Sequence, residues 1–351
     1  MKKIRIAQIG TEHDHATPMM ETFRMLDDIF EVVGYAFTDE ELAGINQNMY
    51  KGGKRAYEGV KLYTIQQLLD MDDLDAVAIE AEDMYLVKYA NMFAKKGVHV
   101  HMDKPGSQST EDFEEMLSNM KKSGKIFSIG YMYRHNPAVK NLLEKIEKGV
   151  FGEIYSVEAH MSRNDQVWKR NWLGSYKGGM NFFLGSHLVD LIVQIQGIPE
   201  SVLPLNCSTH LNDVHNEDYG MAILKYKNGV SFEKSCASER GGFARRQLVI
   251  CGSKGTAEIR PLEGPAEGQH MCSNNIIEAI APENDLCAWT VPYKSGGEFK
   301  FHRYANMVID FANRIKANDQ GKYTLEYEAR VHRVILVASG IECDYKGEIN
   351  L

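Results

Sequence analysis

The sequence predicts an α/β protein with a doubly wound parallel sheet, followed by an α+β part built on a large, mostly antiparallel open sheet. Three observations support this prediction. Short apolar strands alternate with amphipathic helices up to residue 130. Hairpin-like strands take over after Tyr131. The length of 351 residues suits about two domains, which we expect at 1–130 and 131–351.

The first part predicts a Rossmann-type sheet, because repeated strand–helix units with crossover connections make parallel sheets. Gly97 is expected to end one of its helices, and Ser109 is expected to cap the next. Strands are expected at 4–9, 30–37, 76–79, 98–102 and 126–129, with a short one at Tyr63, and helices at 17–26, 65–69, 85–96 and 113–122.

The second part predicts an antiparallel sheet. Asn228-Gly229 is a hairpin turn signal between two alternating runs, and Gly252–Gly255 separates two more. We expect a surface loop at 261–269, which is rich in Gly, Pro and Glu. Strands are expected at 154–159, 219–226, 230–235, 247–251 and 256–259, and helices at 137–148, 302–316 and 326–339.

Composition excludes several classes of function. A net charge of −8 without a basic stripe argues against a nucleic-acid partner. No apolar run is long enough to span a membrane. The six cysteines are scattered, without a CxxC pair, so neither a zinc ribbon nor a disulfide framework is indicated. We expect a cytoplasmic protein.

Lys104 is the first candidate site residue. It lies in Asp103-Lys104-Pro105, directly after the strand expected at 98–102. Pro105 ends that strand, because proline has no N–H for the ladder. Lys104 is therefore expected at the carboxyl edge of the sheet, where open α/β sheets bind ligands and a buried lysine can move protons. On local sequence alone, a solvated lysine before a turn is the commoner interpretation.

Several segments together resemble the Gfo/Idh/MocA oxidoreductases, the family of glucose–fructose oxidoreductase and inositol dehydrogenase. Asp103–Pro105 is similar to the family's Glu-Lys-Pro, and Gly130–Pro137 resembles the segment that opens its second domain. Gly178-Gly179 with Gly185–Asp190 resembles the glycine-rich helix that carries a catalytic histidine. Cys251–Thr256 is similar to a family hairpin.

The resemblance implies an NAD(P)-dependent dehydrogenase of a sugar, polyol or derivative. Hydride would pass to the nicotinamide while a base takes the hydroxyl proton. Lys104 would orient the reacting oxygen and share its proton, and His187 would be the general acid/base. The alternative for His187 is a buried, satisfied histidine on a helix. The resemblance also implies a homo-oligomer, a dimer or tetramer, associated through the sheet between 219 and 259.

The chain departs from the family pattern where the cofactor would bind. Its first turn, 10–15, keeps only Gly10 of the expected G-x-G-x-x-G, and its acids would repel a diphosphate. Phe37 stands where a ribose-binding acid is expected, and Phe183 stands where an aspartate should precede the catalytic histidine. The cofactor-binding residues that we expect, for NAD or NADP, are Gly10, Thr11, Glu12, His13, Thr38, Glu80, Asp103 and Lys104.

Acids and histidines follow the first, fourth and fifth strands, where the family has glycine, threonine and proline. Imidazoles and carboxylates in one cleft are metal-ligand chemistry. We favour the other interpretation, a polar rim of solvated side chains with a histidine capping the first helix, because separate loops need not converge. The metal-ligand candidates are His13, His15, His101 and Asp103.

The substrate is expected to be a small carbohydrate or polyol. Trp168–Trp172 is either a sugar-stacking loop or an amphipathic surface loop. The substrate-binding candidates are Tyr131, Arg134, Arg163, Trp168, Arg170, Tyr176 and His187. Two other functions stay open on the same fold: a redox-neutral or metal-assisted lyase, hydratase or glycosidase, and a non-catalytic ligand sensor.

Overall fold

The structure is a computed structural model that describes residues 2–45, 53–281, 291–349 and 351. It divides into two compact units. Unit 1 holds the described residues up to Tyr131, the segment Tyr304–Arg333, and the described residues from Lys346 onward; unit 2 holds Met132–Arg303 and Val334–Tyr345. The domain limits expected at 1–130 and 131–351 stay a prediction.

Unit 1 contains the expected doubly wound parallel sheet, with strand order β3-β2-β1-β4-β5-β6. All residues of β4 and β5 are buried, as in a sheet covered on both faces. The strands are β1 (Ile4–Ile9), β2 (Phe30–Ala36), β3 (Leu62–Tyr63), β4 (Ala76–Ile79), β5 (His99–Met102) and β6 (Phe127–Ile129).

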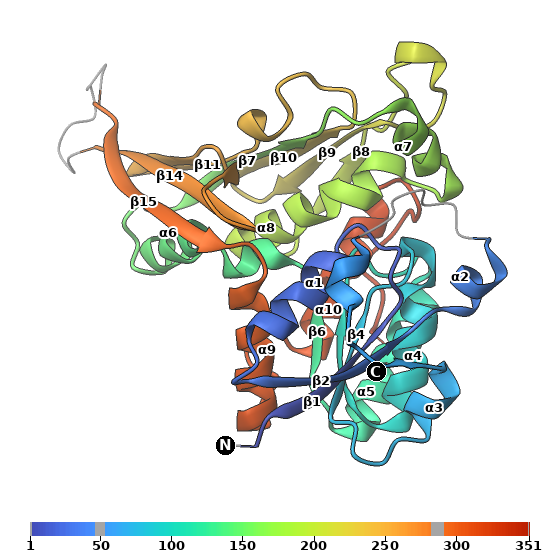
Figure 1. Cartoon of the computed structure of the whole chain (residues 1–351). Coiled ribbons are helices and arrows are strands. Elements are labelled where there is room, and N and C mark those ends of the chain that lie inside the picture. The colour runs from blue at the N-terminus through green and yellow to red at the C-terminus, as the bar shows by residue number, and fades with distance from the viewer. Residues whose placement is uncertain (1, 46–52, 282–290, 350) are drawn as a thin grey trace. The chain divides into compact units, whose positions relative to one another are not determined.

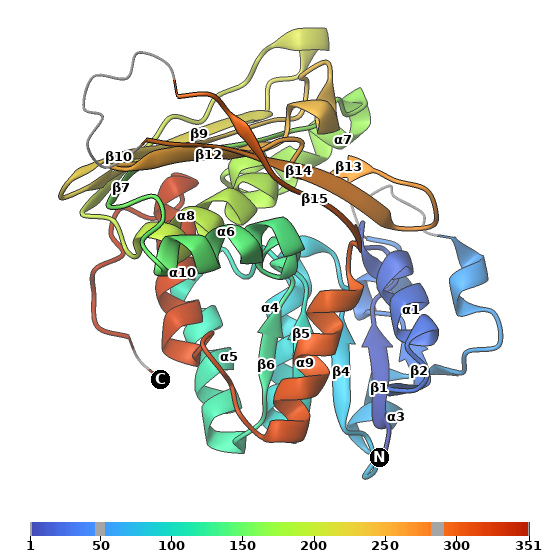
Figure 2. The same cartoon turned by 90° about the vertical axis from the view of Figure 1, so that its left-hand side faces the viewer.

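Helices cover both faces of this sheet. Figures 1 and 2 show α1 and α9 on one face and α3, α4 and α5 on the other. Gly97 ends α4 with φ +85°, and the Ser109 hydroxyl caps α5 by accepting the Asp112 N–H at 3.1 Å, both as predicted. The helices are α1 (Ala16–Met25), α2 (Asp39–Ala43), α3 (Ile65–Leu69), α4 (Leu86–Lys96), α5 (Thr110–Ser123) and α9 (Ala305–Ala317); the chain passes into unit 2 within α10 (Leu325–Ala338).

Unit 2 is built on a nine-stranded sheet of order β13-β14-β12-β11-β7-β10-β9-β8, with β15 paired to β14. Among the described strands of this sheet, only β7 and β10 pair in parallel, so the expected mostly antiparallel sheet is confirmed. The strands are β7 (Ile154–Ser162), β8 (Ser201–Pro204), β9 (Tyr219–Tyr226), β10 (Gly229–Cys236), β11 (Gln247–Gly252), β12 (Gly255–Ile259), β13 (Gly264–Pro265), β14 (Met271–Ile280) and β15 (Lys294–His302).

Two helices of unit 2, α6 (Pro137–Glu147) and α8 (Ser186–Gln196), lie on one face of this sheet (Figures 1 and 2). Two expected loops differ from the structure. Within 261–269, Leu262 and Glu263 are buried, and β13 pairs with β14. The segment expected as a loop at 168–172 forms helix α7 (Val167–Trp172) instead, because Trp172 has an apolar core to pack against.

The part of the chain that the structure describes has no helix both long and apolar enough to cross a membrane. Its five cysteines, at 207, 236, 251, 272 and 343, are free thiols. Cys287 lies outside the described residues.

Candidate active site

Lys104 lies buried at the carboxyl edge of the parallel sheet in unit 1. It follows β5 and is 1% exposed, so the interpretation as a solvated surface lysine is wrong. Its backbone N–H donates to Oδ1 of Asp103 at 2.6 Å. The Asp103 N–H in turn donates to the carbonyl of Ile79 at 3.1 Å, which extends the β4–β5 ladder past both strand ends. The sheet itself therefore fixes where Asp103 and Lys104 stand.

Acids and histidines from three neighbouring strand ends meet beside Lys104. The strands β1, β4 and β5 are adjacent in the sheet, so the residues that follow them converge. His13 lies between three carboxylates: its Nδ1 is 3.4 Å from Oδ2 of Asp103 and 3.6 Å from Oε2 of Glu80, and its Nε2 is 3.7 Å from Oδ1 of Asp83. Nδ1 of His15 is 2.9 Å from Oδ2 of Asp103.

Burial and neighbouring charges pull the pKa values in this cluster apart. Burial alone would lower the pKa of His13, but the carboxylates of Asp103 and Asp83 outweigh it and raise that pKa. For His15, burial outweighs the contact with Asp103 and lowers the pKa. Burial opposes the Asp103 carboxylate, yet the two histidines hold the pKa of Asp103 well below its ordinary value.

The pKa of Glu80 is shifted in the opposite direction to that of Asp103. Burial and the neighbouring Asp103 carboxylate raise the pKa of Glu80 well above its ordinary value. A pair of close carboxyl groups with separated pKa values is typical of functional sites. This edge of the sheet therefore holds two carboxyl groups whose pKa values are shifted in opposite directions, that of Asp103 downward and that of Glu80 upward.

The polar rim that the sequence favoured does not form. The side chains of His13, Glu80 and Asp103 are buried, and the loops do converge. His15 occupies the N-cap position of α1, but its own side chain makes no capping hydrogen bond; its backbone N–H donates to Nδ1 of His13 at 3.1 Å. His101 is buried apart from this group, with its ring 5.8 Å from that of Phe311 on α9, so the metal-ligand candidates come together without it.

Glu41 is a site residue that the sequence analysis missed. Its Oε1 accepts hydrogen bonds from the Thr11 N–H at 2.6 Å and the Thr11 hydroxyl at 3.0 Å, and its Oε2 accepts the Thr38 N–H at 2.6 Å. The carboxylate therefore joins the turn after β1 to the end of β2, next to Phe37, where a ribose-binding acid was expected. The signal was the capping-box spacing of Thr38 and Glu41.

A pocket of about 400 Å³ opens beside this carboxylate. Its walls come from the turn after β1, the end of β2, and the 54–58 segment. The rings of Tyr35 and Tyr57 lie 4.9 Å apart there, and Tyr35 meets Phe37 edge to face at 5.7 Å. The lining residues are Thr11, Glu12, Tyr35, Phe37, Lys54, Tyr57 and Glu58.

The two halves of a dinucleotide fit these residues differently. Aromatic walls beside a strand-end carboxylate suit an adenosine. The turn that would receive the diphosphate suits it poorly. Glu12 replaces the glycine that normally admits the phosphates, and the Thr11 N–H is already bonded to a carboxylate. The pocket therefore suits the adenosine half of a dinucleotide, whereas the diphosphate half would lie next to acidic side chains.

In unit 2, His187 lies in the first turn of α8 and is 1% exposed. The π-helix Asn181–Gly185 leads directly into this helix, and such segments occur frequently at functional sites. The His187 ring meets Tyr133 edge to face at 5.0 Å. Arg246 Nη1 donates to the Tyr133 hydroxyl at 2.9 Å, and this hydroxyl donates to Glu263 at 3.1 Å, so the ring that supports His187 is held firmly.

Phe183 fills the position where the family pattern expects an aspartate. Its ring packs edge to face against Trp172 at 5.3 Å. The buried ammonium of Lys169 lies 3.7 Å from the Trp172 ring and 5.0 Å from the Phe183 ring. An aromatic face attracts a cation, so a cation–aromatic contact occupies this part of unit 2.

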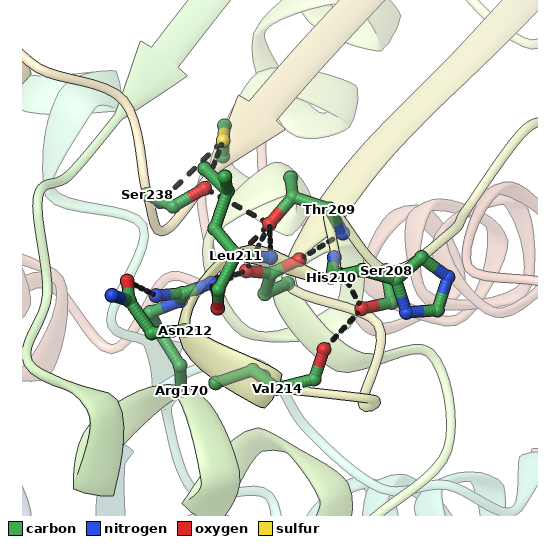
Figure 3. Close-up of polar contacts among 10 residues, drawn as sticks. Arg170, Ser208, Thr209, His210, Leu211, Asn212, Val214 and Ser238 are labelled. Carbon is green, nitrogen blue, oxygen red and sulfur yellow. Dashed lines mark hydrogen bonds and ion pairs between the residues drawn. The ribbon is translucent and has the colours of Figure 1, made fainter.

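Two arginines expected to bind substrate are engaged in buried ion pairs. Arg134 donates two hydrogen bonds to Oδ1 of Asp190, from Nε at 3.0 Å and from Nη2 at 2.6 Å. Arg170 donates from Nε to Asp218 at 2.8 Å. Figure 3 shows its guanidinium reaching the 209–212 segment, with Nη2 2.6 Å from the carbonyl of Leu211. Both arginines are 2% exposed, and their ion pairs connect segments within unit 2. A buried arginine paired in this way is poorly placed to bind a substrate.

The remaining substrate candidates stand in different surroundings. Tyr131 is buried in unit 1, with its hydroxyl 3.4 Å from the carbonyl of Pro105. In unit 2, Arg163 is half-buried and donates to Asp165 at 2.9 Å, and Trp168 donates to Gln166 at 2.8 Å. Tyr176 is buried against Trp172 and Phe182. Their roles toward a substrate stay a prediction.

Family models match both parts of the chain. A model described as an oxidoreductase family with an NAD-binding Rossmann fold matches residues 4–131, and a model of the Gfo/Idh/MocA C-terminal domain matches residues 139–258. The chain belongs to the Gfo/Idh/MocA oxidoreductase family. The resemblance expected from Asp103–Pro105 and Gly185–Asp190 is thereby confirmed, and the protein is an oxidoreductase rather than a non-catalytic sensor.

Individual family members are distant. An uncharacterized oxidoreductase of Schizosaccharomyces pombe is 25% identical over 99% of this chain and 97% of its own length. The D-glucoside 3-dehydrogenase of Escherichia coli is 27% identical over 36% of each chain. A solved levoglucosan dehydrogenase, in complex with NADH and levoglucosan, aligns with a TM-score of 0.76 at 16% identity, over 99% of this chain and all of that one. At that identity the likeness shows the fold alone.

Proposed function

We propose that this chain is an NAD(P)-dependent dehydrogenase of a sugar, polyol or related carbohydrate. The observation that carries the proposal is Lys104, buried beside Asp103 at the carboxyl edge of a sheet whose family model is NAD-binding. The D-glucoside 3-dehydrogenase and the levoglucosan dehydrogenase, both similar to this chain, support a carbohydrate substrate.

The adenosine half of the cofactor would occupy the pocket beside Thr11, between Tyr35, Phe37 and Tyr57. The bound cofactor would supply a nicotinamide ring to receive the hydride removed from the carbon that is oxidised. We propose NAD rather than NADP. Among the described residues, the pocket lining carries Glu12 and Glu58 against one cation, Lys54, and Glu41 adds a carboxyl group beside it. A 2′-phosphate would meet like charge there.

Lys104 and His187 would handle the proton of the reacting hydroxyl. Lys104 is fixed by the β5 edge, and its ammonium would orient the oxygen and share the proton. His187 is held by the Tyr133 ring and would take the proton as general base. This division of roles is supported by the family resemblance of Asp103–Pro105 and Gly185–Asp190.

The experiment is a fluorescence titration with NADH and NADPH, followed by a screen of sugars and polyols with the oxidised cofactors. We expect NADH to bind more tightly than NADPH, and turnover by the Lys104→Met variant at saturating NAD⁺ to fall by at least about a hundredfold. Lys125→Met is the matched control, since Lys125 precedes β6 on the same sheet. Absence of binding by either cofactor at millimolar concentration would contradict the proposal.

We also propose that the protein is a homo-oligomer, a dimer or tetramer, associated through the open sheet face of unit 2. Along β9 the buried residues alternate with half-exposed apolar ones, Met221 and Ile223 among them. Such a face is typical of an interface. Light scattering is expected to give a multiple of 39.7 kDa; a monomer at micromolar concentration would refute the assembly.

A further inference from the structure

The cluster at the ends of β1, β4 and β5 contains more polar atoms than it can satisfy by itself. Both carboxylate oxygens of Glu80, both of Asp83, and Nε2 of His13 have no hydrogen-bond partner among the described residues. All three side chains are at most 1% exposed. A buried polar atom without a partner destabilises the fold, and an ionised group does so more strongly. Their placement calls for a positive charge between them.

The separations in the cluster match those of metal ligands. Nitrogen and oxygen ligands bind a first-row cation at about 2.0–2.2 Å, which places neighbouring ligand atoms about 3–3.5 Å apart. Nδ1 of His15 lies 2.9 Å from Oδ2 of Asp103, and Nδ1 of His13 lies 3.4 Å from the same oxygen. Oε2 of Glu80 is 3.6 Å from that Nδ1. His13, His15 and Asp103 each offer one ligand atom, and these three atoms lie within 4.8 Å of one another.

We propose that this cluster binds one first-row divalent transition-metal cation, with His13, His15 and Asp103 as ligands and Glu80 as the fourth. Two imidazoles with carboxylates select Zn²⁺, Fe²⁺ or Mn²⁺ over Mg²⁺ and Ca²⁺, which prefer oxygen ligands alone.

The second nitrogen of His13 supports this arrangement. A histidine that binds metal through one nitrogen usually donates its other N–H to a carboxylate, which fixes the ring. Nε2 of His13 faces Oδ1 of Asp83 at 3.7 Å, ready for that bond. Nδ1 of His13 now accepts the backbone N–H of His15 at 3.1 Å, and metal binding would replace this contact.

The cation would also change what the sheet edge attracts. The turn after β1 carries Glu12 where phosphates are expected, and the buried carboxylates behind it repel anions. A divalent cation there offsets the negative charge of the carboxylates and can itself bind a phosphate or hydroxyl oxygen. This consequence rests on the proposed function, whereas metal binding itself does not.

The test uses protein without an affinity tag, treated with a chelator and titrated with ZnCl₂ by calorimetry in the absence of nucleotide. We expect one equivalent of Zn²⁺ per chain. His13→Gln and Asp103→Asn are each expected to weaken binding by at least about tenfold. His215→Gln, which removes an exposed histidine of unit 2, is expected to bind as the parent does.

A second measurement needs no variant. The parent protein loaded with Co²⁺ is expected to show visible absorption bands of nitrogen and oxygen coordination, which ZnCl₂ abolishes by displacement. Absence of stoichiometric Zn²⁺ binding by the parent protein, or unchanged affinity in both His13→Gln and Asp103→Asn, would overturn the proposal. Neither outcome depends on NADH, so failure of the metal site and failure of the proposed dehydrogenase are distinguishable.

Discussion

Replacing Glu233 with glutamine is expected to remove a large part of the pH dependence of stability in unit 2. Glu233 lies on β10, fully buried, and its Oε2 approaches Gly185 in the π-helix that precedes α8. Neither of its carboxylate oxygens has a hydrogen-bond partner among the described residues. Burial raises the pKa of Glu233 from 4.5 to about 8.

The magnitude follows from these two pKa values. A carboxyl group whose pKa is raised on folding stabilises the folded state below its unfolded value, near 4.5, and this contribution is lost as the pH rises through about 8. A tenfold change in the proton affinity of one group corresponds to about 1.4 kcal/mol, so Glu233 accounts for up to about 5 kcal/mol. Most of this contribution to the free energy of unfolding disappears between about pH 5 and about pH 9.

The assay is urea denaturation of the parent protein and of Glu233→Gln across that pH range. At the alkaline end of this range, we expect the difference in free energy of unfolding between the variant and the parent to be about 4 kcal/mol more in favour of the variant than at the acidic end. The reason is that glutamine does not ionise. Glu158→Gln, at a half-exposed position on the neighbouring strand β7, is the control and should follow the parent. Parallel stability curves for Glu233→Gln and the parent would refute the reasoning.

Three further substitutions test other parts of the structure. Gly10→Ala is expected to destabilise unit 1 by about 1–3 kcal/mol in urea denaturation. Gly10 has φ +90°, and an added Cβ would lie 2.5 Å from the Glu80 carbonyl oxygen. Parent-like stability would contradict this close approach. Asp218→Asn is expected to lower the free energy of unfolding by about 3–5 kcal/mol in thermal unfolding, because Arg170 would keep an uncompensated buried charge. An unchanged Tm would show that the ion pair is not needed for stability. His187→Asn is expected to lower kcat by about 10²–10⁴-fold while NADH affinity stays the same; full activity would exclude a proton-transfer role.

The sequence was informative where local patterns decide the structure. Alternating strands and helices predicted the parallel sheet, and Gly97 and Ser109 were placed correctly because capping depends on neighbours in the chain. Lys104 could be placed at the sheet edge for the same reason, since Pro105 ends the strand beside it.

The misses depend on packing between distant segments. Whether His13, Glu80 and Asp103 meet is set by the order β1-β4-β5 and the strand lengths, and no local pattern contains that information. The 168–172 segment was expected as a loop, either one that stacks on a sugar or an amphipathic loop at the surface. Arg170 is buried only because Asp218 lies 48 residues away in the chain and next to it in space.

The most direct test of the proposed function is the transfer of deuterium from a carbohydrate to the nicotinamide. The protein is incubated with NAD⁺ and a sugar deuterated at the oxidised carbon, identified by the substrate screen, and the NADH is examined by mass spectrometry. We expect deuterium in the NADH formed by the parent protein, and almost none formed by Lys104→Met. Sugar conversion without deuterium in the NADH, or equal transfer by Lys104→Met, would contradict the account.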